Sequence, residues 1–127
     1  MAVINRALVI GGGIGGLVAA RALRLRGIEV DLIEKQPQWT VYGVGIIQPI
    51  NALRALDSIG LAAACIARGG PYEAWRVFAA NGDIIFDPPQ HDSGSHFPTL
   101  NGITRPILHE ILIDGAKAAG VDIRLGV

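Results

Sequence analysis

The sequence contains few residues that could form cross-links. Its 127 residues include one cysteine, Cys65, and three histidines. One cysteine excludes an internal disulfide, and a structural zinc site takes about four ligands. Cys65 lies in the apolar run Leu61–Ala67. We therefore interpret it as a small buried residue of a protein in a reducing compartment.

The sequence also lacks an excess of charge and a long hydrophobic run. Eleven Lys and Arg residues balance eleven Asp and Glu residues, so no basic excess is available to neutralise the phosphates of a nucleic acid. No apolar run approaches the roughly 20 residues of a membrane-spanning helix, and the N-terminus does not read as a signal peptide. With 50% hydrophobic and 17% charged residues, the composition predicts a cytoplasmic globular protein that binds neither nucleic acid nor membranes.

Glycine, in contrast, is abundant, with 17 residues, and a cluster of them follows a short apolar run. That run, Arg6–Ile10, predicts a buried parallel strand. Residues Ile14–Arg26 favour a helix that stops at Gly27, and Glu29–Glu34 predicts a second strand. Together these segments form a β-α-β unit of about 30 residues, which indicates the α/β class.

Weaker signals divide the rest of the chain. They predict a loop over Gln36–Gln48, a helix opened by Pro49, a short helix ending at Ala67, a hairpin over Ala74–Asp87 turning at Asn81-Gly82, an irregular loop over Pro88–Thr99, a helix starting at Thr104–Pro106 and ending at Gly120, and a third parallel strand over Val121–Leu125. In the first helix, Arg21 and Arg24 are three residues apart, so we expect them to share its solvent face.

The glycine cluster has the spacing of a dinucleotide-binding loop. It reads G-x-G-x-x-G at Gly11, Gly13 and Gly16, between a predicted strand and a predicted helix. Gly11 allows the tight turn, Gly13 lets the backbone approach a pyrophosphate, and Gly16 lets helix and strand pack closely. Ile14 and Gly15 lie at the helix start, where unpaired N–H groups favour an anion.

An acidic residue completes this fingerprint. Glu34 ends the second strand, 23 residues after Gly11, where a carboxylate can accept hydrogen bonds from a ribose. The same charge would repel a 2′-phosphate, so the site suits FAD or NAD better than NADP. These two features alone do not separate FAD from NAD.

Beyond this unit, the chain resembles the FAD-dependent aromatic hydroxylases, single-component flavoprotein monooxygenases of the para-hydroxybenzoate or salicylate hydroxylase type. The resemblance is carried by the glycine loop, Glu34-Lys35, Gly43-Val-Gly45-Ile46, Asn51-Ala52-Leu53, Leu56-x-x-x-Gly60-Leu61 and Arg105-x-x-Leu108-His109-x-x-Leu112. Two positions depart from the family pattern: Pro49 lies one residue early, and Lys35 replaces the usual arginine.

The resemblance implies an FAD-dependent monooxygenase that hydroxylates a small phenolic substrate with NADH or NADPH and O2. It places Lys35 and Gly45 at the cofactor and gives Arg105 contact with the FAD ribityl and diphosphate region. It also implies a Rossmann-like FAD-binding domain with an inserted β-sheet domain. We expect residues 1–70 to form the first part of the FAD-binding domain, residues 71–100 to start the substrate sheet, and residues 101–127 to return to the FAD-binding domain.

Several interpretations stay open. The chain could instead belong to another FAD- or NAD-dependent oxidoreductase on a Rossmann fold, or to a non-catalytic nucleotide-binding module. No catalytic residue and no metal site are indicated; His91 and His96 are expected in solvent or near substrate, and His109 in a structural role. Because the first strand would keep one open edge, we expect the chain to be an N-terminal portion or a homo-oligomer, and to be inactive alone.

Overall fold

The β-α-β unit forms as the sequence predicts, except that its first strand is not buried: Arg6–Ile10 alternates between exposed and half-buried residues, because the helices cover one face of it. In the computed structural model, which describes residues 4–88 and 96–127, β1 (Arg6–Ile10), α1 (Ile14–Arg24) and β2 (Glu29–Glu34) follow one another. β2 pairs in parallel with β1 on one side and with β8 (Asp122–Leu125) on the other. The strand order is therefore β1-β2-β8, which confirms both the α/β class and the predicted third parallel strand.

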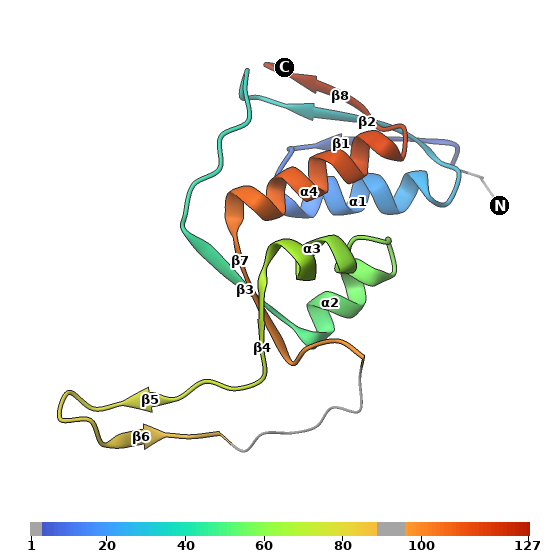
Figure 1. Cartoon of the computed structure of the whole chain (residues 1–127). Coiled ribbons are helices and arrows are strands. Elements are labelled where there is room, and N and C mark those ends of the chain that lie inside the picture. Colours follow the sequence, from blue (N-terminus) through green and yellow to red (C-terminus); the bar gives the residue numbers. More distant parts are fainter. Residues whose placement is uncertain (1–3, 89–95) are drawn as a thin grey trace.

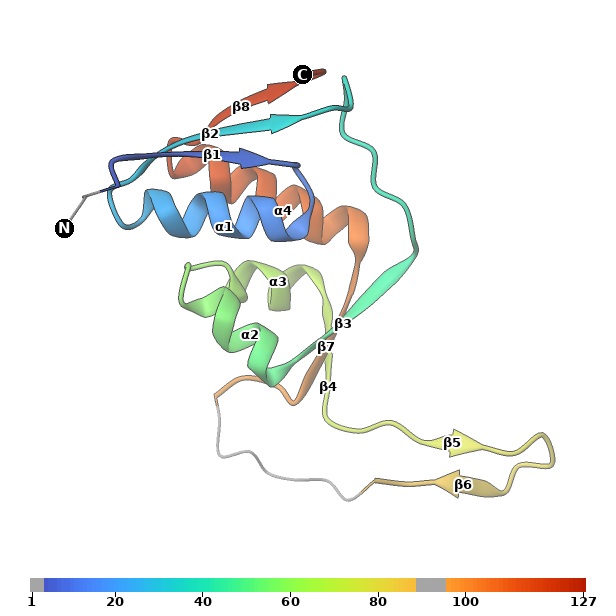
Figure 2. The same ribbon diagram turned by 180° about the vertical axis from the view of Figure 1, so that it is seen from behind.

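Helices α1 and α4 (Arg105–Ala118) pack on one face of this sheet (Figure 1). Thr104 precedes α4 as its cap, and its side-chain hydroxyl accepts a hydrogen bond from the Ile107 N–H at 3.4 Å. Pro106 lies in the first turn and Gly120 follows the helix with a φ of 83°, as predicted. The two helices start at the same end of the molecule, where β2 ends (Figure 2).

A second sheet was not predicted from the sequence. Strands β3 (Gly45–Pro49), β7 (Leu100–Thr104) and β4 (Gly70–Tyr72) form an antiparallel sheet in the order β3-β7-β4. The loop expected over Gln36–Gln48 is therefore wrong at its C-terminal end, since four of those residues belong to a strand. Pro49 ends β3 and caps the following helix, rather than forming its first residue.

Two short helices separate β3 from β4. These are α2 (Ile50–Asp57) and α3 (Ala62–Arg68). Between them Gly60 has a φ of 72°, and the Leu61 N–H donates to the Leu56 carbonyl at 2.9 Å, which is the helix C-terminal turn that the sequence predicts.

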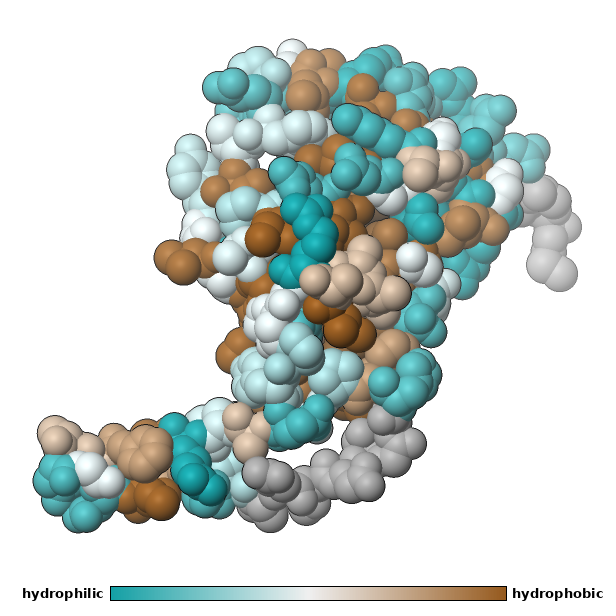
Figure 3. Space-filling view, viewed as in Figure 1, coloured by the Kyte–Doolittle hydropathy of each residue, from teal (hydrophilic) through white to brown (hydrophobic). Residues whose placement is uncertain are grey.

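The predicted hairpin extends away from the body as an arm (Figures 1 and 3). Its strands, β5 (Val77–Phe78) and β6 (Ile84–Phe86), are shorter than the predicted segments. Gly82, with a φ of 92°, is the single residue of the turn with positive φ. The Ala79 N–H donates to the Asp83 carbonyl at 2.7 Å and closes the turn.

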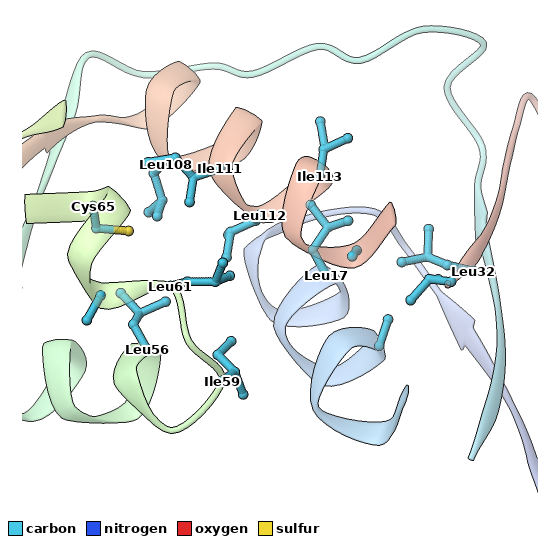
Figure 4. Close-up of a cluster of buried hydrophobic side chains, with 14 of the residues drawn as sticks. Leu17, Leu32, Leu56, Ile59, Leu61, Cys65, Leu108, Ile111, Leu112 and Ile113 are labelled. Atoms are coloured by element: carbon cyan, nitrogen blue, oxygen red, sulfur yellow. The ribbon is translucent and has the colours of Figure 1, made fainter. Parts of the chain in front are cut away.

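The core extends from the two short helices past α4 and α1 to the inner face of the parallel sheet, where Leu32 of β2 is buried. Leu108, Ile111 and Leu112 of α4 point toward Leu56 and Leu61 (Figure 4). Cys65 is fully buried in the same cluster, as predicted, and burial raises the pKa of its thiol. Within the described ranges, no helix is long and apolar enough to cross a membrane.

Arg21 and Arg24 do not share a solvent face, which corrects the expectation from their spacing. The Arg21 guanidinium donates to the carbonyl oxygens of Ile59 and Gly115. Arg24 donates to the Ala119 carbonyl at 3.1 Å. Both arginines therefore join α1 to carbonyl oxygens at the C-terminal end of α4 and in the turn after α2.

Candidate functional site

The glycine loop turns sharply between β1 and α1. Gly11 has a φ of 103°, which favours glycine, and its N–H donates to the Ile33 carbonyl at 2.8 Å. A Cβ atom at Gly16 would overlap the Gly11 carbonyl oxygen and lie 3.4 Å from Val9 Cγ1. The close packing of strand and helix expected from Gly16 is therefore present in the structure.

The other glycines leave the N-terminus of α1 open. Gly13 is the cap residue, and no side chain caps the helix and no acidic residue lies in its first turn. Gly13 and Gly15 are exposed, and a Cβ atom on either would have no neighbour within 4 Å. Unpaired N–H groups thus face accessible space at the positive end of the helix dipole, which is an arrangement that binds phosphate.

Glu34 lies directly against this loop. Its Oε2 accepts a hydrogen bond from the Gly12 N–H at 2.8 Å, and its Oε1 accepts one from the Gln36 N–H at 3.0 Å. The hydrogen bond from the Gln36 N–H, and after it the one from the Gly12 N–H, hold the pKa of the Glu34 carboxyl below its ordinary value. A carboxylate at the end of β2 with free lone pairs fits the hydroxyl groups of a ribose.

Two further residues hold the loop, and sequence reasoning did not identify this role. His109 Nε2 lies 2.7 Å from the Gly12 carbonyl oxygen, and the Trp39 ring meets the His109 ring edge-on at a centroid distance of 5.1 Å. With Gly12, Gly13 and Glu34, both line a small cavity of about 80 Å³. His109 belongs to the motif Arg105-x-x-Leu108-His109-x-x-Leu112, whereas no sequence signal indicates a role for Trp39.

Arg105 starts α4 and lies against Gly43. Gly43 has a φ of 98°, and a Cβ atom there would come within 2.8 Å of Arg105 Cδ. In the part of the chain that the structure describes, the Arg105 guanidinium has no carboxylate within ion-pair distance. Gly45 begins β3 opposite Thr104, and Lys35 is exposed after Glu34. The structure thus brings Glu34 to the glycine loop and places Arg105 at the same end of the molecule.

A broad apolar groove lies beside the second sheet. Its volume is about 760 Å³, and its lining includes Val44, Ile47, Arg68, Gly102 and Ile107. The groove thus runs along β3 and β7 up to the first turn of α4. A planar apolar molecule could lie on such a surface.

No metal site is formed by the described residues, where no group of three or more His, Cys, Asp or Glu side chains could hold an ion. His96 is exposed, and its ring lies tilted by 42° against that of Phe97 at a centroid distance of 3.9 Å. His91 lies outside the described residues.

Comparisons with known proteins agree with this geometry. Residues 5–127 match the family described as FAD binding domain. A 2-heptyl-3-hydroxy-4(1H)-quinolone synthase of Mycobacteroides abscessus is 54% identical over 123 residues, covering 96% of this chain and 32% of that protein. A 3-hydroxybenzoate 6-hydroxylase of Polaromonas naphthalenivorans is 32% identical over 119 residues, covering 89% and 29%.

The fold is also similar to solved structures. The tetrameric form of 2-methyl-3-hydroxypyridine-5-carboxylic acid oxygenase superposes with a TM-score of 0.84 at 30% identity, covering 98% of this chain and 32% of that one. The chain therefore spans about a third of the length of the relatives that it matches. These findings confirm the resemblance to FAD-dependent aromatic hydroxylases that the motifs indicated.

Proposed function

The chain belongs to the family of FAD binding domains, and from that premise we propose that it is the FAD-binding part of a flavin-dependent monooxygenase. The open N-terminus of α1 facing Glu34 is the observation that carries the proposal, because this loop fits a diphosphate and a ribose together. The named relatives that act on aromatic compounds support hydroxylation of a small, phenolic substrate.

Each candidate residue has a defined task in this proposal. Gly13, Ile14 and Gly15 offer N–H groups to the diphosphate, while Gly11 and Gly16 give the loop its close turn. The Glu34 carboxylate accepts hydrogen bonds from the adenosine ribose.

The second group of residues lies toward the flavin. The Arg105 guanidinium forms no ion pair with a carboxylate of the described residues. It binds the ribityl and diphosphate oxygens with its planar fork of donors. Gly45 leaves room beside the ring system, and Lys35 adds a positive charge next to Glu34. Bound FAD would supply the oxygen chemistry, with NADH or NADPH as reductant, while the protein positions it and excludes water.

The rest of the molecule is assigned accordingly. Residues 1–70 and 101–127 contribute to FAD binding, and residues 71–100, with the protruding hairpin, begin the part that faces substrate. We place the protein in the cytoplasm, and we propose that either a homo-oligomer or a further C-terminal portion covers the open edge of the parallel sheet. The 127-residue chain alone is not expected to catalyse hydroxylation, because it spans about a third of the length of the relatives that it matches.

The test uses the protein as expressed from its own gene. A yellow preparation with flavin absorbance is expected, together with NADH or NADPH consumption and O2 uptake that phenolic compounds stimulate. A colourless protein that binds NAD but no FAD would instead support a nicotinamide-dependent oxidoreductase. FAD binding without any stimulated turnover would leave the cofactor assignment standing and contradict the monooxygenase assignment.

A further inference from the structure

Gly12 is held from both sides by side chains of other elements. Its N–H donates to Glu34 Oε2 from the end of β2 at 2.8 Å, and its carbonyl oxygen lies 2.7 Å from His109 Nε2 of α4. A carbonyl oxygen can only accept, so the His109 Nε2 must carry the proton and donate it. Gly12 itself is buried, as is His109.

The bond to the Gly12 carbonyl also sets the direction of the next N–H group. The Gly12 carbonyl and the Gly13 N–H belong to one trans peptide plane, and they point in opposite directions. A donor that fixes the carbonyl on the α4 side therefore aims the Gly13 N–H away from α4. Gly13 caps α1 and is exposed, so this N–H faces the open space at the helix start.

Such a restraint has a large effect at this position. Gly11, Gly12 and Gly13 follow one another, and glycine loses more conformational freedom on ordering than any other residue. Trp39 restricts the segment further, since a Cβ atom at Gly12 would come within 2.5 Å of Trp39 Cζ3, and the Trp39 ring meets His109 edge-on. His109 and Trp39 together thus restrain the conformation of the loop.

His109 also links two parts of the candidate site. It lies four residues after Arg105, so both side chains leave the same face of α4, one turn apart. A single rigid helix therefore presents the arginine and restrains the glycine loop.

We propose that His109 is a positioning residue, whose Nε2–H orients the Gly12–Gly13 peptide so that the Gly13 N–H meets the cofactor diphosphate. This proposal rests on the proposed FAD binding and deepens it. The role is carried through Gly12, and His109 itself does not take part in the oxygen chemistry.

Three variants of the protein expressed from its own gene test this. His109→Met removes the donor, and His109→Gln keeps an N–H donor of similar reach. Leu112→Val is the control, because Leu112 is buried on the same helix and packs in the core away from the loop. The measurements are the FAD dissociation constant by fluorescence titration and, without FAD, the ¹⁵N shift of His109 Nε2 and the hydrogen exchange of the Gly12 and Gly13 amides.

We expect a protonated Nε2, and faster exchange of the hydrogen-bonded Gly12 amide in His109→Met, with the exposed Gly13 amide as the unprotected reference. The FAD dissociation constant should rise about tenfold in His109→Met, the scale of a lost hydrogen bond, and stay near the parent value in His109→Gln and Leu112→Val. The proposal would be overturned by an unprotonated Nε2 or by an unchanged FAD dissociation constant in His109→Met. It would also be overturned if His109→Gln or Leu112→Val bound FAD as weakly as His109→Met. A parent protein that binds no FAD would overturn the proposed function as well.

Discussion

Glu34 shows how one side chain can both shape a loop and leave room for a ligand. Its two oxygens accept the Gly12 and Gln36 N–H groups, and each oxygen keeps a further lone pair. In Glu34→Gln one of these acceptors becomes a donor and the charge is lost. We expect FAD binding to weaken by about 1–3 kcal/mol, the scale of a lost charge-assisted hydrogen bond, while the fold persists.

The matched control for this change is Glu29→Gln. Glu29 begins the same strand and is exposed at its opposite end. FAD titration of both variants separates a local effect from a general loss of charge. Equal dissociation constants for Glu34→Gln and the parent would contradict the ribose assignment.

Gly13 and Gly16 should respond differently to the addition of a side chain. A Cβ atom at Gly13 meets nothing within 4 Å, and its φ of −76° suits any residue. Gly13→Val should therefore melt within a few degrees of the parent but lose FAD, because the new methyl groups occupy the space of the diphosphate. Gly16→Ala should fail to fold well, since its Cβ would overlap the Gly11 carbonyl oxygen.

Thermal melts and FAD titration of both variants check this contrast. Ala19→Val adds the same kind of bulk to an exposed position of α1, and it should affect neither measurement strongly. If Gly13→Val kept full FAD affinity, the diphosphate would have to bind elsewhere.

Arg105 offers a test of geometry rather than charge. Arg105→Lys keeps the positive charge, but an ammonium group cannot reproduce the planar fork of guanidinium donors. We expect the FAD dissociation constant to rise by about tenfold, the loss of one charge-assisted hydrogen bond. Arg54→Lys, at an exposed position of α2, is the control. A lysine variant that binds FAD like the parent would make Arg105 a surface residue.

At the scale of elements, the parallel sheet is joined on its outer face by ion pairs. Asp31 of β2 pairs with Arg6 of β1 at 2.8 Å and with Arg124 of β8 at 3.0 Å. The hydrogen bond from Arg6, followed by the charges of both arginines, holds the pKa of the Asp31 carboxyl below its ordinary value. Both arginine side chains are more than half exposed, so the two ion pairs contribute modestly to the stability of the fold, and salt screens them.

The lowered pKa of Asp31 determines how the stabilisation by its ion pairs depends on pH. The stabilisation is complete above the unfolded-state pKa, near 3.9, and is lost as the pH falls through the lower pKa of the folded state. Asp31→Asn should therefore lower the melting temperature at pH 7 and reduce its fall between pH 5 and pH 2. Asp114→Asn, exposed on α4, is the control. An unchanged acid profile in Asp31→Asn would show that other carboxyl groups dominate.

Elements with local signals could be predicted from the sequence, and elements without them could not. β1, α1 and β2 have apolar periodicity and glycine stops, and α4 has a cap and Pro106. Strands β3, β4 and β7 instead contain Gly45, Gly70 and Gly102 together with two prolines, residues that disfavour strands. They form because β7 pairs with segments more than 25 residues away, and the local sequence does not contain that information.

The same distinction applies to the candidate site. The positions of Gly11, Gly16 and Glu34 followed from motif spacing, since a β-α-β unit fixes where the loop meets the second strand. The contact of His109 with Gly12 joins residues 97 positions apart, and it depends on how α4 packs beside α1. Arg21 was misplaced for a similar reason, because its partners on α4 and at Ile59 are distant in sequence.

At the scale of the whole molecule, one face of the parallel sheet is uncovered in the described structure. α1 and α4 pack on the inner face, while Leu8 and Ile10 of β1 point outward and are 58% and 79% exposed. No described strand pairs with the second edge of β1. Exposed apolar residues beside an open strand edge favour association with another chain.

We therefore expect the 127-residue chain, produced alone, to self-associate through this face and to retain little FAD. Burying a leucine side chain contributes about 1.5–3 kcal/mol, so Leu8→Lys should weaken the association at least about tenfold. Leu25→Lys is the matched control, because Leu25 is 54% exposed at the far end of α1. Sedimentation velocity over a range of concentrations measures both variants. A parent chain that stays monomeric and keeps one FAD per molecule through gel filtration would contradict this prediction, since the open edge would then need no cover.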